Sequence, residues 1–480
     1  MKILIQCGDH LENQNRIMTL ATELKIAGHT PIILLYSKHK GRYFENQGIQ
    51  TVSLEENTPL DQPQANITID SSLESGIKYN DILNAEAKRR PMISWPGQRV
   101  KTIRDIYKVH RAISKIIDSL KPEKIIIWNG FTGYVANTLR LICASRNVEC
   151  AFMERGLLKD SLFIDRQGVN GASSLNALTP DLLDGLTVQK EDITYVSDLF
   201  SVDTHPKINA SISTTHNVFF PLQVQLDTNI ILYCKYRSMR EAFLDIYAAL
   251  NKKESLFLVR PHPEETQDSF TNIPRFDNTK VTASESLDHW IDWSDIVVTI
   301  NSTVGLEALI KGKQVITLGE SIYSSAGLTS SLPAPLIPVD AKHNTRLINY
   351  LIFLTKNNIL ISNSPYNKSV IASQLFIESS KIKKAEHADT KETAEAAEIH
   401  IDFPLNATLD LTYRKNKAPI TKGWLTDIVK SHVNAATYEF SNSNKPRKDR
   451  FSVKIVSESK TSKHDYKFNK TIDIYGNEVR

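Results

Sequence analysis

The first third of the chain alternates short apolar runs with longer segments of helical spacing. Residues 12–27 place Ile17, Leu20 and Leu24 on one helical face, and Gly28 is suited to end that helix. The predicted elements, in order, are strands at 2–7, 30–36, 124–128 and 149–153 and helices at 12–27, 102–120 and 133–146. Strands separated by helices indicate a parallel sheet that is covered on both faces.

A second alternating series follows a polar stretch at 160–215, where we place the crossing between domains. Its predicted strands are 230–234, 256–259, 296–300 and 314–318, and its predicted helices are 237–250 and 304–311. Helices at 345–356 and 368–381 are expected to close this second unit. The pattern therefore predicts an α/β fold of two Rossmann-like domains, 1–215 and 216–384, that face a central cleft, followed by a C-terminal extension at 385–480.

The extension has a different character. An Ala/Glu/Lys/Thr stretch leads into short alternating segments, and residues 445–470 carry nine basic against three acidic side chains. We interpret the extension as a basic, solvated and partly disordered tail, with a site for an anionic partner as the alternative.

Bulk composition narrows the function classes. With 480 residues, 41% of them apolar and 23% charged, the chain is too long for one core and is not a disordered protein. A net charge of +4 gives no support to a nucleic-acid binder. The four cysteines show no C-x-x-C spacing and are expected to be free thiols. The start reads as a strand and not as a signal peptide, and no apolar run spans a bilayer, so a cytoplasmic protein is expected.

The strongest local signal is the end of one strand and the start of the next helix. Asn301, Ser302 and Thr303 follow the strand 296–300 directly, so hydroxyls and free backbone N–H groups converge at a helix start, which favours anions. Plain helix capping is the alternative, and it uses the same geometry. Gly305 permits close approach of a ligand or a strand, and Glu307, one turn later, is placed to reach a ribose hydroxyl or a base.

A second signal lies after the strand 256–259. That strand delivers Arg260 and His262 to its carboxyl end, and Pro261 and Pro263 stiffen the turn around the imidazole. We interpret His262 as a group held against a leaving phosphate; a histidine satisfied by loop carbonyls is the alternative.

These motifs resemble the bacterial capsule polysaccharide biosynthesis family. The segments that carry the resemblance are Arg260 to Pro263, Asn301 to Leu309, the stretch 319–329 with Tyr323 and Gly327-Leu328-Thr329, and the stretch 220–227. The family includes β-Kdo transferases, which are inverting GT-B enzymes that use CMP-Kdo. The resemblance covers roughly residues 120–330 and is absent after Lys384.

The resemblance implies roles for particular residues. The pairs His262-Pro263 and Ser302-Thr303 would hold the donor phosphate, and Glu307 would lie on the cytidine side. The family's acidic residue after a first-domain strand corresponds to Glu154, but Arg155 replaces the second acid of the family's Glu-Asp-Gly-Phe stretch. That departure leaves Asp160 and Asp165 as rival bases, and an ion pair with an arginine as the structural alternative for Glu154.

Missing motifs complete the prediction. There is no Asp-x-Asp near a strand end, no Gly-x-Gly-x-x-Gly after the first strand, and no Gly-x-Ser-x-Gly or Walker motif. We therefore expect a metal-independent glycosyltransferase with an acceptor domain at 1–215 and a donor domain at 216–384. It would use no cofactor and would transfer Kdo from CMP-Kdo, with Glu154 as the base and with His262, Arg260 and the helix start at Asn301 stabilising the leaving phosphate.

The expected partners are a nucleotide sugar, a glycolipid or polysaccharide acceptor and, peripherally, the inner-membrane capsule export machinery; nucleic acid is not expected. Two alternatives stay open. One is a CDP-polyol phosphotransferase of the teichoic-acid type, which would use the same phosphate site. The other is a non-catalytic component of an export machine that binds nucleotide or polysaccharide.

Overall fold

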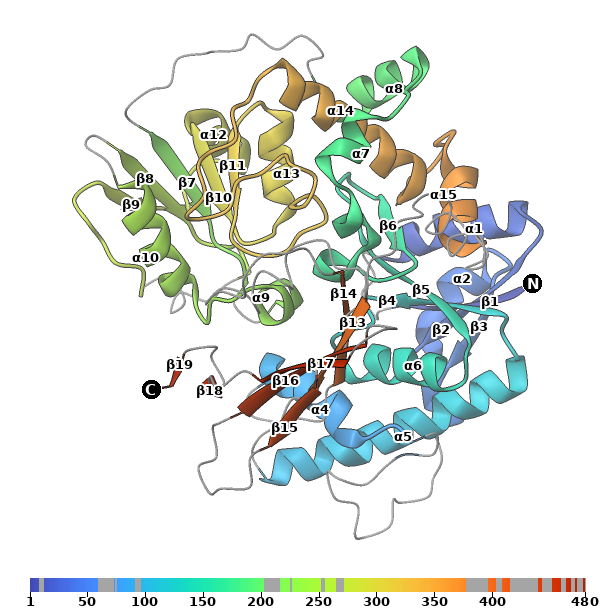
Figure 1. Cartoon of the computed structure of the whole chain (residues 1–480). Helices are drawn as coiled ribbons and strands as arrows, with labels where there is room; N and C mark the ends of the chain where they lie inside the picture. Colours follow the sequence, from blue (N-terminus) through green and yellow to red (C-terminus); the bar gives the residue numbers. More distant parts are fainter. Residues whose placement is uncertain are drawn as a thin grey trace. The chain divides into compact units, whose positions relative to one another are not determined.

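Figure 1 shows the computed structural model of the chain. It describes residues 1–7, 13–58, 73, 76–90, 96–202, 216–224, 227–251, 255–264, 272–376 and the strands between 396 and 479. The chain divides into two compact units, Met1–Ile377 and Glu378–Arg480. The first unit contains two sheets, each covered by its own helices.

The first sheet is mostly parallel. Its strands are β1 (Lys2–Gln6), β2 (Thr30–Leu35), β3 (Gln50–Ser53), β4 (Lys124–Trp128), β5 (Glu149–Arg155), β6 (Leu162–Asp165) and β12 (Ile359–Leu360), in the spatial order β12-β6-β5-β4-β1-β2-β3. The pairs among β1 to β5 are parallel, whereas β6 runs antiparallel to both β5 and β12. The strand order reverses between β1 and β4, and such a reversal opens a crevice at the carboxyl ends of the two strands.

Helices cover both faces of this sheet, as the apolar runs predict. The helices are α1 (Gln14–Ile26), α2 (Arg42–Glu45), α3 (Leu54–Asn57), α4 (Tyr79–Arg89), α5 (Pro96–Leu120), α6 (Tyr134–Ser145), α7 (Pro180–Asp184) and α8 (Lys190–Phe200). Within β1, Leu4 belongs to one buried cluster, while Ile3 and Ile5 belong to the cluster on the opposite face. Successive side chains of a strand point to opposite faces, so an unbroken apolar run requires burial on both.

The second sheet is wholly parallel. Its strands are β7 (Asn217–Pro221), β8 (Leu256–Arg260), β9 (Thr279–Val281), β10 (Ile296–Thr299) and β11 (Gln314–Thr317), in the order β11-β10-β7-β8-β9. Its helices are α9 (Thr228–Tyr233), α10 (Met239–Leu250), α12 (Leu287–Trp293) and α13 (Thr303–Ile310). Here the order reverses between β7 and β10. We call the part built on the first sheet the first lobe and the part built on β7 to β11 the second lobe.

The chain returns to the first lobe after the second sheet. Helix α14 (Ala341–Asn357) leads into β12, whose Ile359 pairs with Phe163 of β6, and then into α15 (Asn367–Leu375). Val370 and Ile371 of α15 belong to the same buried cluster as β1. The expectation that helices at 345–356 and 368–381 close the second unit is therefore wrong for the second helix, and residues 359–376 lie with the first lobe although we assigned them to the segment 216–384.

One predicted strand is a helix. Residues 230–234 were expected to form a strand, but Thr228–Tyr233 is α9, and the true first strand of the second lobe is β7. A short apolar run has no periodicity that separates a strand from a buried helical turn. The local signal that decides it is Asp227, whose side chain accepts a hydrogen bond from Asn229 N at 2.8 Å and caps the helix.

The fold class is confirmed: the chain has two Rossmann-like parallel sheets in a GT-B-like pair that faces a central cleft. The second unit is a separate antiparallel sheet. Its described strands are β13 (Ala396–Asp402), β14 (Thr408–Arg414), β15 (Glu439–Asn442), β16 (Phe451–Glu458), β17 (Lys463–Lys467), β18 (Thr471–Ile472) and β19 (Glu478–Val479). The basic run 445–470 falls partly on β16 and β17 and otherwise lies outside the described residues. None of the helices in the described ranges has the length and apolar content that crossing a membrane requires.

Candidate functional site

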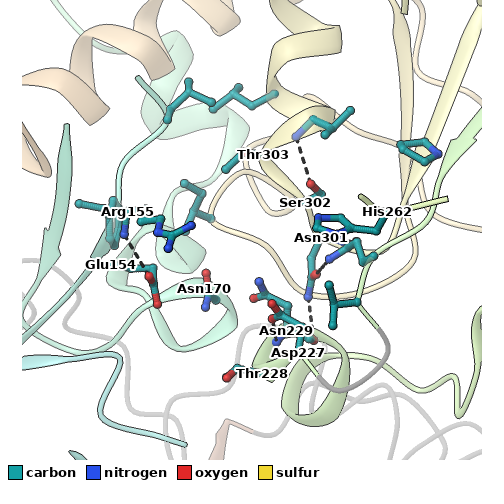
Figure 2. Close-up of a pocket in the computed structure, with 18 of the residues that line it drawn as sticks. Glu154, Arg155, Asn170, Asp227, Thr228, Asn229, His262, Asn301, Ser302 and Thr303 are labelled. Carbon is teal, nitrogen blue, oxygen red and sulfur yellow. Dashed lines mark hydrogen bonds between the residues drawn. The ribbon is translucent and has the colours of Figure 1, made fainter. Parts of the chain in front are cut away.

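The switch points of the two sheets meet at one cleft. It has a volume of about 960 Å3, and its walls come from the loops that follow β1, β4 and β5 in the first lobe and β7, β8 and β10 in the second. Figure 2 shows Glu154 and Arg155 on one side of this cleft and His262, Ser302 and Thr303 on the other. The carboxyl ends of parallel strands are where ligands bind in such sheets, so the cleft is the candidate site.

Glu154 lies in the cleft wall near the end of β5. One carboxylate oxygen, Oε1, accepts from the backbone N of Arg155 at 3.1 Å, and the other, Oε2, accepts from Nδ2 of Asn129 at 3.3 Å. Burial raises the pKa of Glu154, and the charge of Asp227 adds to the rise, against the two hydrogen bonds and the charge of Arg155. A carboxylate with a raised pKa is a stronger base, and this one faces the open cleft.

The two rival acids lie outside the cleft lining. Asp160 is exposed and forms an ion pair with Arg16 at 3.9 Å. Asp165 is fully buried, and its carboxylate accepts hydrogen bonds from the loop 167–174, including Ser173 Oγ at 2.7 Å and Ser174 N at 2.9 Å. Asp165 therefore holds a loop in place, and Glu154 is the one of the three predicted carboxylates that lines the cleft.

His262 faces Glu154 from the second lobe. Its Nδ1 accepts a hydrogen bond from the backbone N of Glu264 at 3.1 Å. In the neutral ring the proton then resides on Nε2, which leaves an N–H donor for a ligand. Pro261 and Pro263 flank the ring, and both also line the cleft. A turn is thus present at this position, and the half-buried imidazole accepts a loop contact through Nδ1.

Arg260 brings a cation to the same wall. It is the last residue of β8, and its Nε is buried without a hydrogen-bond partner among the described residues. A buried N–H of a guanidinium is costly to leave unpaired, so an anionic or strongly polar ligand group in the cleft would satisfy it.

The start of α13 is the third feature, after His262 and Arg260, that the second lobe contributes to the cleft wall. Ser302 caps the helix by accepting from Val304 N at 3.3 Å, and Thr303, its first residue, is exposed toward the cleft. The predicted capping is thus present, and it leaves the helix start open to the cleft. The positive end of the helix dipole favours a phosphate at this position, as does the Thr303 hydroxyl, which has no partner within the described ranges.

Asn301 plays a different part from the one expected. Its amide nitrogen donates to Asn229 O at 2.9 Å and to Glu320 O at 3.1 Å, and its amide oxygen accepts from Gln223 Nε2 at 3.1 Å. Both donors are used, so the side chain ties three segments of the cleft wall together. Asn301 shapes the site through these segments and has no spare N–H for a ligand.

Gly305 and Glu307 do not line the cleft. A Cβ at Gly305 would lie 2.2 Å from Oη of Tyr323, so the glycine makes room for this tyrosine and not for a ligand. The tyrosine hydroxyl donates to the carbonyl of Ser302 and braces the helix start. Glu307 points toward α12, where burial raises its pKa, with Asp288 adding to the rise and Lys311 opposing it. Its expected place on the cytidine side is therefore not met in this structure.

Several cleft residues were not anticipated. Asn129 and Asn170 sit at the carboxyl side of the first sheet with φ of 59° and 56°, a left-handed conformation that asparagine tolerates. Asp227 and Thr228 stand at the start of α9, a segment for which the sequence pattern predicted a strand. The available signal was the Trp-Asn-Gly turn at 128–130 after a strong strand, since polar residues at that edge gather at the crevice. Among the described residues, no three His, Cys, Asp or Glu side chains are grouped as metal ligands.

Comparison with known proteins relates one segment of the chain to a family. Residues 203–349 match the family model of capsule polysaccharide biosynthesis proteins. This segment, which is less than half of the chain, is similar to the capsule polysaccharide biosynthesis family. It contains Arg260, His262 and the start of α13, so the resemblance drawn from these motifs is confirmed.

Two curated relatives share parts of the chain. Protein FixF of Sinorhizobium fredii is 30% identical over 203 residues, which are 42% of this chain and 49% of FixF. The lipopolysaccharide-processing protein LpsZ of Rhizobium meliloti is 33% identical over 112 residues, 22% of this chain and 25% of LpsZ. The matches therefore span half or less of each relative.

Solved structures resemble this one at low sequence identity. The KpsC beta Kdo 2,7 transferase of Thermosulfurimonas dismutans has 16% identity and a TM-score of 0.35, and the match covers 49% of this chain and 79% of that one. The glycosyltransferase SnogD of Streptomyces nogalater has 10% identity and a TM-score of 0.25, with 73% and 94% covered.

Proposed function

We propose that the capsule-family chain is an inverting, metal-independent glycosyltransferase of bacterial surface-polysaccharide assembly, and that it transfers Kdo from CMP-Kdo to a glycolipid or polysaccharide acceptor. One observation carries the proposal: a carboxylate with a raised pKa in the first lobe and a set of phosphate-binding groups in the second lobe line the same cleft. A single displacement requires a base on one side of the reacting carbon and a site for the leaving group on the other side, and the two walls of the cleft provide these.

The reaction would run in one step across the cleft. Glu154 takes the proton of an acceptor hydroxyl as its oxygen attacks the anomeric carbon of the donor sugar. The bond from that carbon to the nucleotide phosphate oxygen breaks, and its electron pair stays on the phosphate. Because attack and departure occur on opposite sides of one carbon, the configuration inverts.

The second lobe would stabilise the charge that develops on the leaving phosphate. His262 Nε2–H, the Arg260 guanidinium and the α13 start at Ser302 and Thr303 provide donors from three directions. Preorganised donors of this kind, aimed at developing charge, usually contribute the largest share of a rate enhancement. With these groups in place the displacement needs no cofactor and no metal ion.

The cytidine nucleotide, the Kdo sugar and a cytoplasmic site of action, peripheral at the inner membrane beside the capsule export machinery, are part of the proposal by family resemblance. Support comes from the match over 203–349 and from the acidic sugar's need for cations such as Arg260. Without a described membrane-crossing helix in the chain, a peripheral position would depend on its acceptor and partners.

The test has two stages. First, melting temperatures are measured with CMP, CDP, UDP and GDP, because a ligand that binds only the folded state raises the melting temperature. CMP and CDP should stabilise the protein selectively, and equal shifts with UDP would refute the cytidine assignment. Second, transfer from CMP-Kdo is compared with transfer from CDP-glycerol. Turnover of CDP-glycerol alone would show a polyol phosphotransferase, and nucleotide binding with no turnover of either donor would show a non-catalytic component.

A further inference from the structure

A line of hydrogen bonds runs from the second lobe to the Glu154 carboxylate. Oγ1 of Thr228, on the first turn of α9, lies 2.6 Å from Oγ1 of Thr132 in the first lobe. Oγ1 of Thr132 lies 3.4 Å from Oδ1 of Asn129, and Nδ2 of Asn129 lies 3.3 Å from Oε2 of Glu154. The side chains of Thr132 and Asn129 are buried, at 8% and 9% exposure, so water competes little with this line.

The orientation of Asn129 is fixed by its neighbours. Its amide oxygen accepts from the backbone N of Phe131 at 3.1 Å and of Thr132 at 3.2 Å. Backbone N–H groups only donate, so the oxygen must face them and the NH2 group must face Glu154. The left-handed backbone at Asn129, with φ of 59°, turns the chain so that both contacts form.

The direction of the remaining bonds follows from that orientation. Because the amide oxygen of Asn129 is an acceptor, Thr132 donates its hydroxyl proton to it. The lone pairs of Thr132 Oγ1 are then available to the hydroxyl of Thr228. All three side chains therefore donate toward the carboxylate, and bonds arranged head to tail in this way strengthen one another.

We propose that Asn129, Thr132 and Thr228 are positioning residues that set the Glu154 carboxylate from helix α9, so that the base in the first lobe is tuned by its contact with the second. The inference rests on the proposed function of Glu154. The short helix α9, which the sequence pattern led us to expect as a strand, contacts the base through the hydrogen bonds of Thr228, Thr132 and Asn129. We call this line of hydrogen bonds the relay.

The same helix start also acts on Glu154 by charge. Asp227, next to Thr228, raises the pKa of Glu154, whereas the donor line from Thr228 stabilises its ionised form. The other titratable or charged groups that line the cleft are Arg155 on the strand of Glu154, Arg260 at the end of β8, His262 and Glu264 after that strand, and Tyr323. Asp227 and Thr228, which are neighbours at the start of α9, thus have opposite effects on the ionisation of Glu154. Variants at the two positions should therefore shift its titration in opposite directions, which a general loss of structure would not do.

The experiment compares the acid limb of the pH–rate profile (kcat/KM) for CMP-Kdo transfer in Thr228→Val, Thr228→Ser and Asp227→Asn. Valine keeps the shape of threonine but removes the donor, so the limb should move to higher pH by roughly half a unit. Serine keeps the hydroxyl and should restore the wild-type limb. The Asp227→Asn change keeps a side-chain oxygen that can cap α9 and removes the charge, so the limb should move to lower pH by about half a unit or more.

A second readout separates this inference from the proposed function. The 13C carboxyl resonance of Glu154, assigned by its loss in Glu154→Gln, is titrated in wild type and in each variant, which requires no turnover. Opposite displacements of this titration in Thr228→Val and Asp227→Asn support the relay even if Glu154→Gln keeps its activity and the base proves to lie elsewhere. A titration that is unmoved in Thr228→Val, or moved equally in Thr228→Ser, overturns the relay.

Discussion

Arg346 of α14 and Asp184 of α7 form a two-pronged salt bridge, with Nε to Oδ1 at 2.8 Å and Nη2 to Oδ2 at 2.7 Å. A third contact from Arg346 reaches Gly327 O at 3.1 Å. Lys342, one helical turn earlier, lies 3.4 Å from the same carboxylate. The pair fastens the helix that follows the second sheet to a helix of the first lobe, close to the return of the chain to β12.

This pair should make stability depend on pH in a defined window. Arg346 lowers the pKa of Asp184 from 3.8 to about 2. A depressed pKa in the folded state contributes stability that is present above the unfolded value and is lost as pH falls from about 4 to about 2. Asp184→Asn should therefore lower the free energy of unfolding at pH 7 by on the order of 1 kcal/mol, since solvent screens the exposed pair, and by much less at pH 2.

Thermal or urea unfolding at pH 7, 4 and 2 checks this expectation. Asp181→Asn, an exposed carboxylate on the same short helix, is the matched control and should change stability little. A loss for Asp184→Asn that is as large at pH 2 as at pH 7 would contradict the electrostatic explanation.

Among the strands that are buried on both faces, the sequence predicted β4 and β10 closely and missed β6 and β7. β4 was predicted to the residue at 124–128, because Pro122 marks a break before it and its run of three isoleucines is short and β-branched, which favours a strand. α9 was missed because the helix is only six residues long and its apolar run, 230–233, is only four, which is too short to show helical periodicity. β12 was missed for another reason: a two-residue strand exists through its partner β6, which lies nearly 200 positions away in the chain.

The residues of the candidate site also differ in how far the sequence predicts them. His262 and Ser302 were predictable because strand ends and helix starts are local features whose chemistry is fixed by the backbone. Glu307 was placed in the cleft by its spacing from the helix start, but it does not line the cleft, and the charges that act on it are those of Asp288 and Lys311. Asn129 was missed because its importance comes from Glu154 and Thr132, contacts that only the folded chain brings together.

Transfer activity should survive removal of divalent metals. In the proposed mechanism, Arg260, His262 and the α13 start, which all line the cleft, would neutralise the leaving phosphate without a metal ion. The initial rate in excess EDTA should stay within about twofold of the untreated rate. Loss of activity in EDTA that magnesium or manganese restores would show that a metal takes part.

Removal of residues 378–480 should leave a folded, nucleotide-binding protein. Both Rossmann-like sheets, and the return strand β12, lie within the unit Met1–Ile377. The truncated chain should melt cooperatively, and its CMP affinity should match that of the full chain within about twofold. Loss of the cooperative melt would mean that the extension is required for folding of the first unit.

Binding and chemistry should separate between the two walls of the cleft. His262 is proposed to touch the donor phosphate before and during the reaction, so His262→Ala should weaken CMP binding by on the order of tenfold and lower turnover as well. Glu154 is proposed to act on the acceptor proton only. Glu154→Gln, nearly the same size but unable to take the proton, should bind CMP normally and lose on the order of a hundredfold or more in rate.

Matched variants show whether such losses are specific to the cleft. His289→Ala changes an exposed histidine of α12 and Glu149→Gln an exposed carboxylate of β5, and neither residue lines the cleft. Both should retain wild-type affinity and rate. If Glu154→Gln keeps near-normal turnover, the base lies elsewhere. Asp227 is then the next residue to change, because it lines the cleft, whereas Asp160 is paired on the surface and Asp165 is buried at the end of β6, where it holds the following loop together.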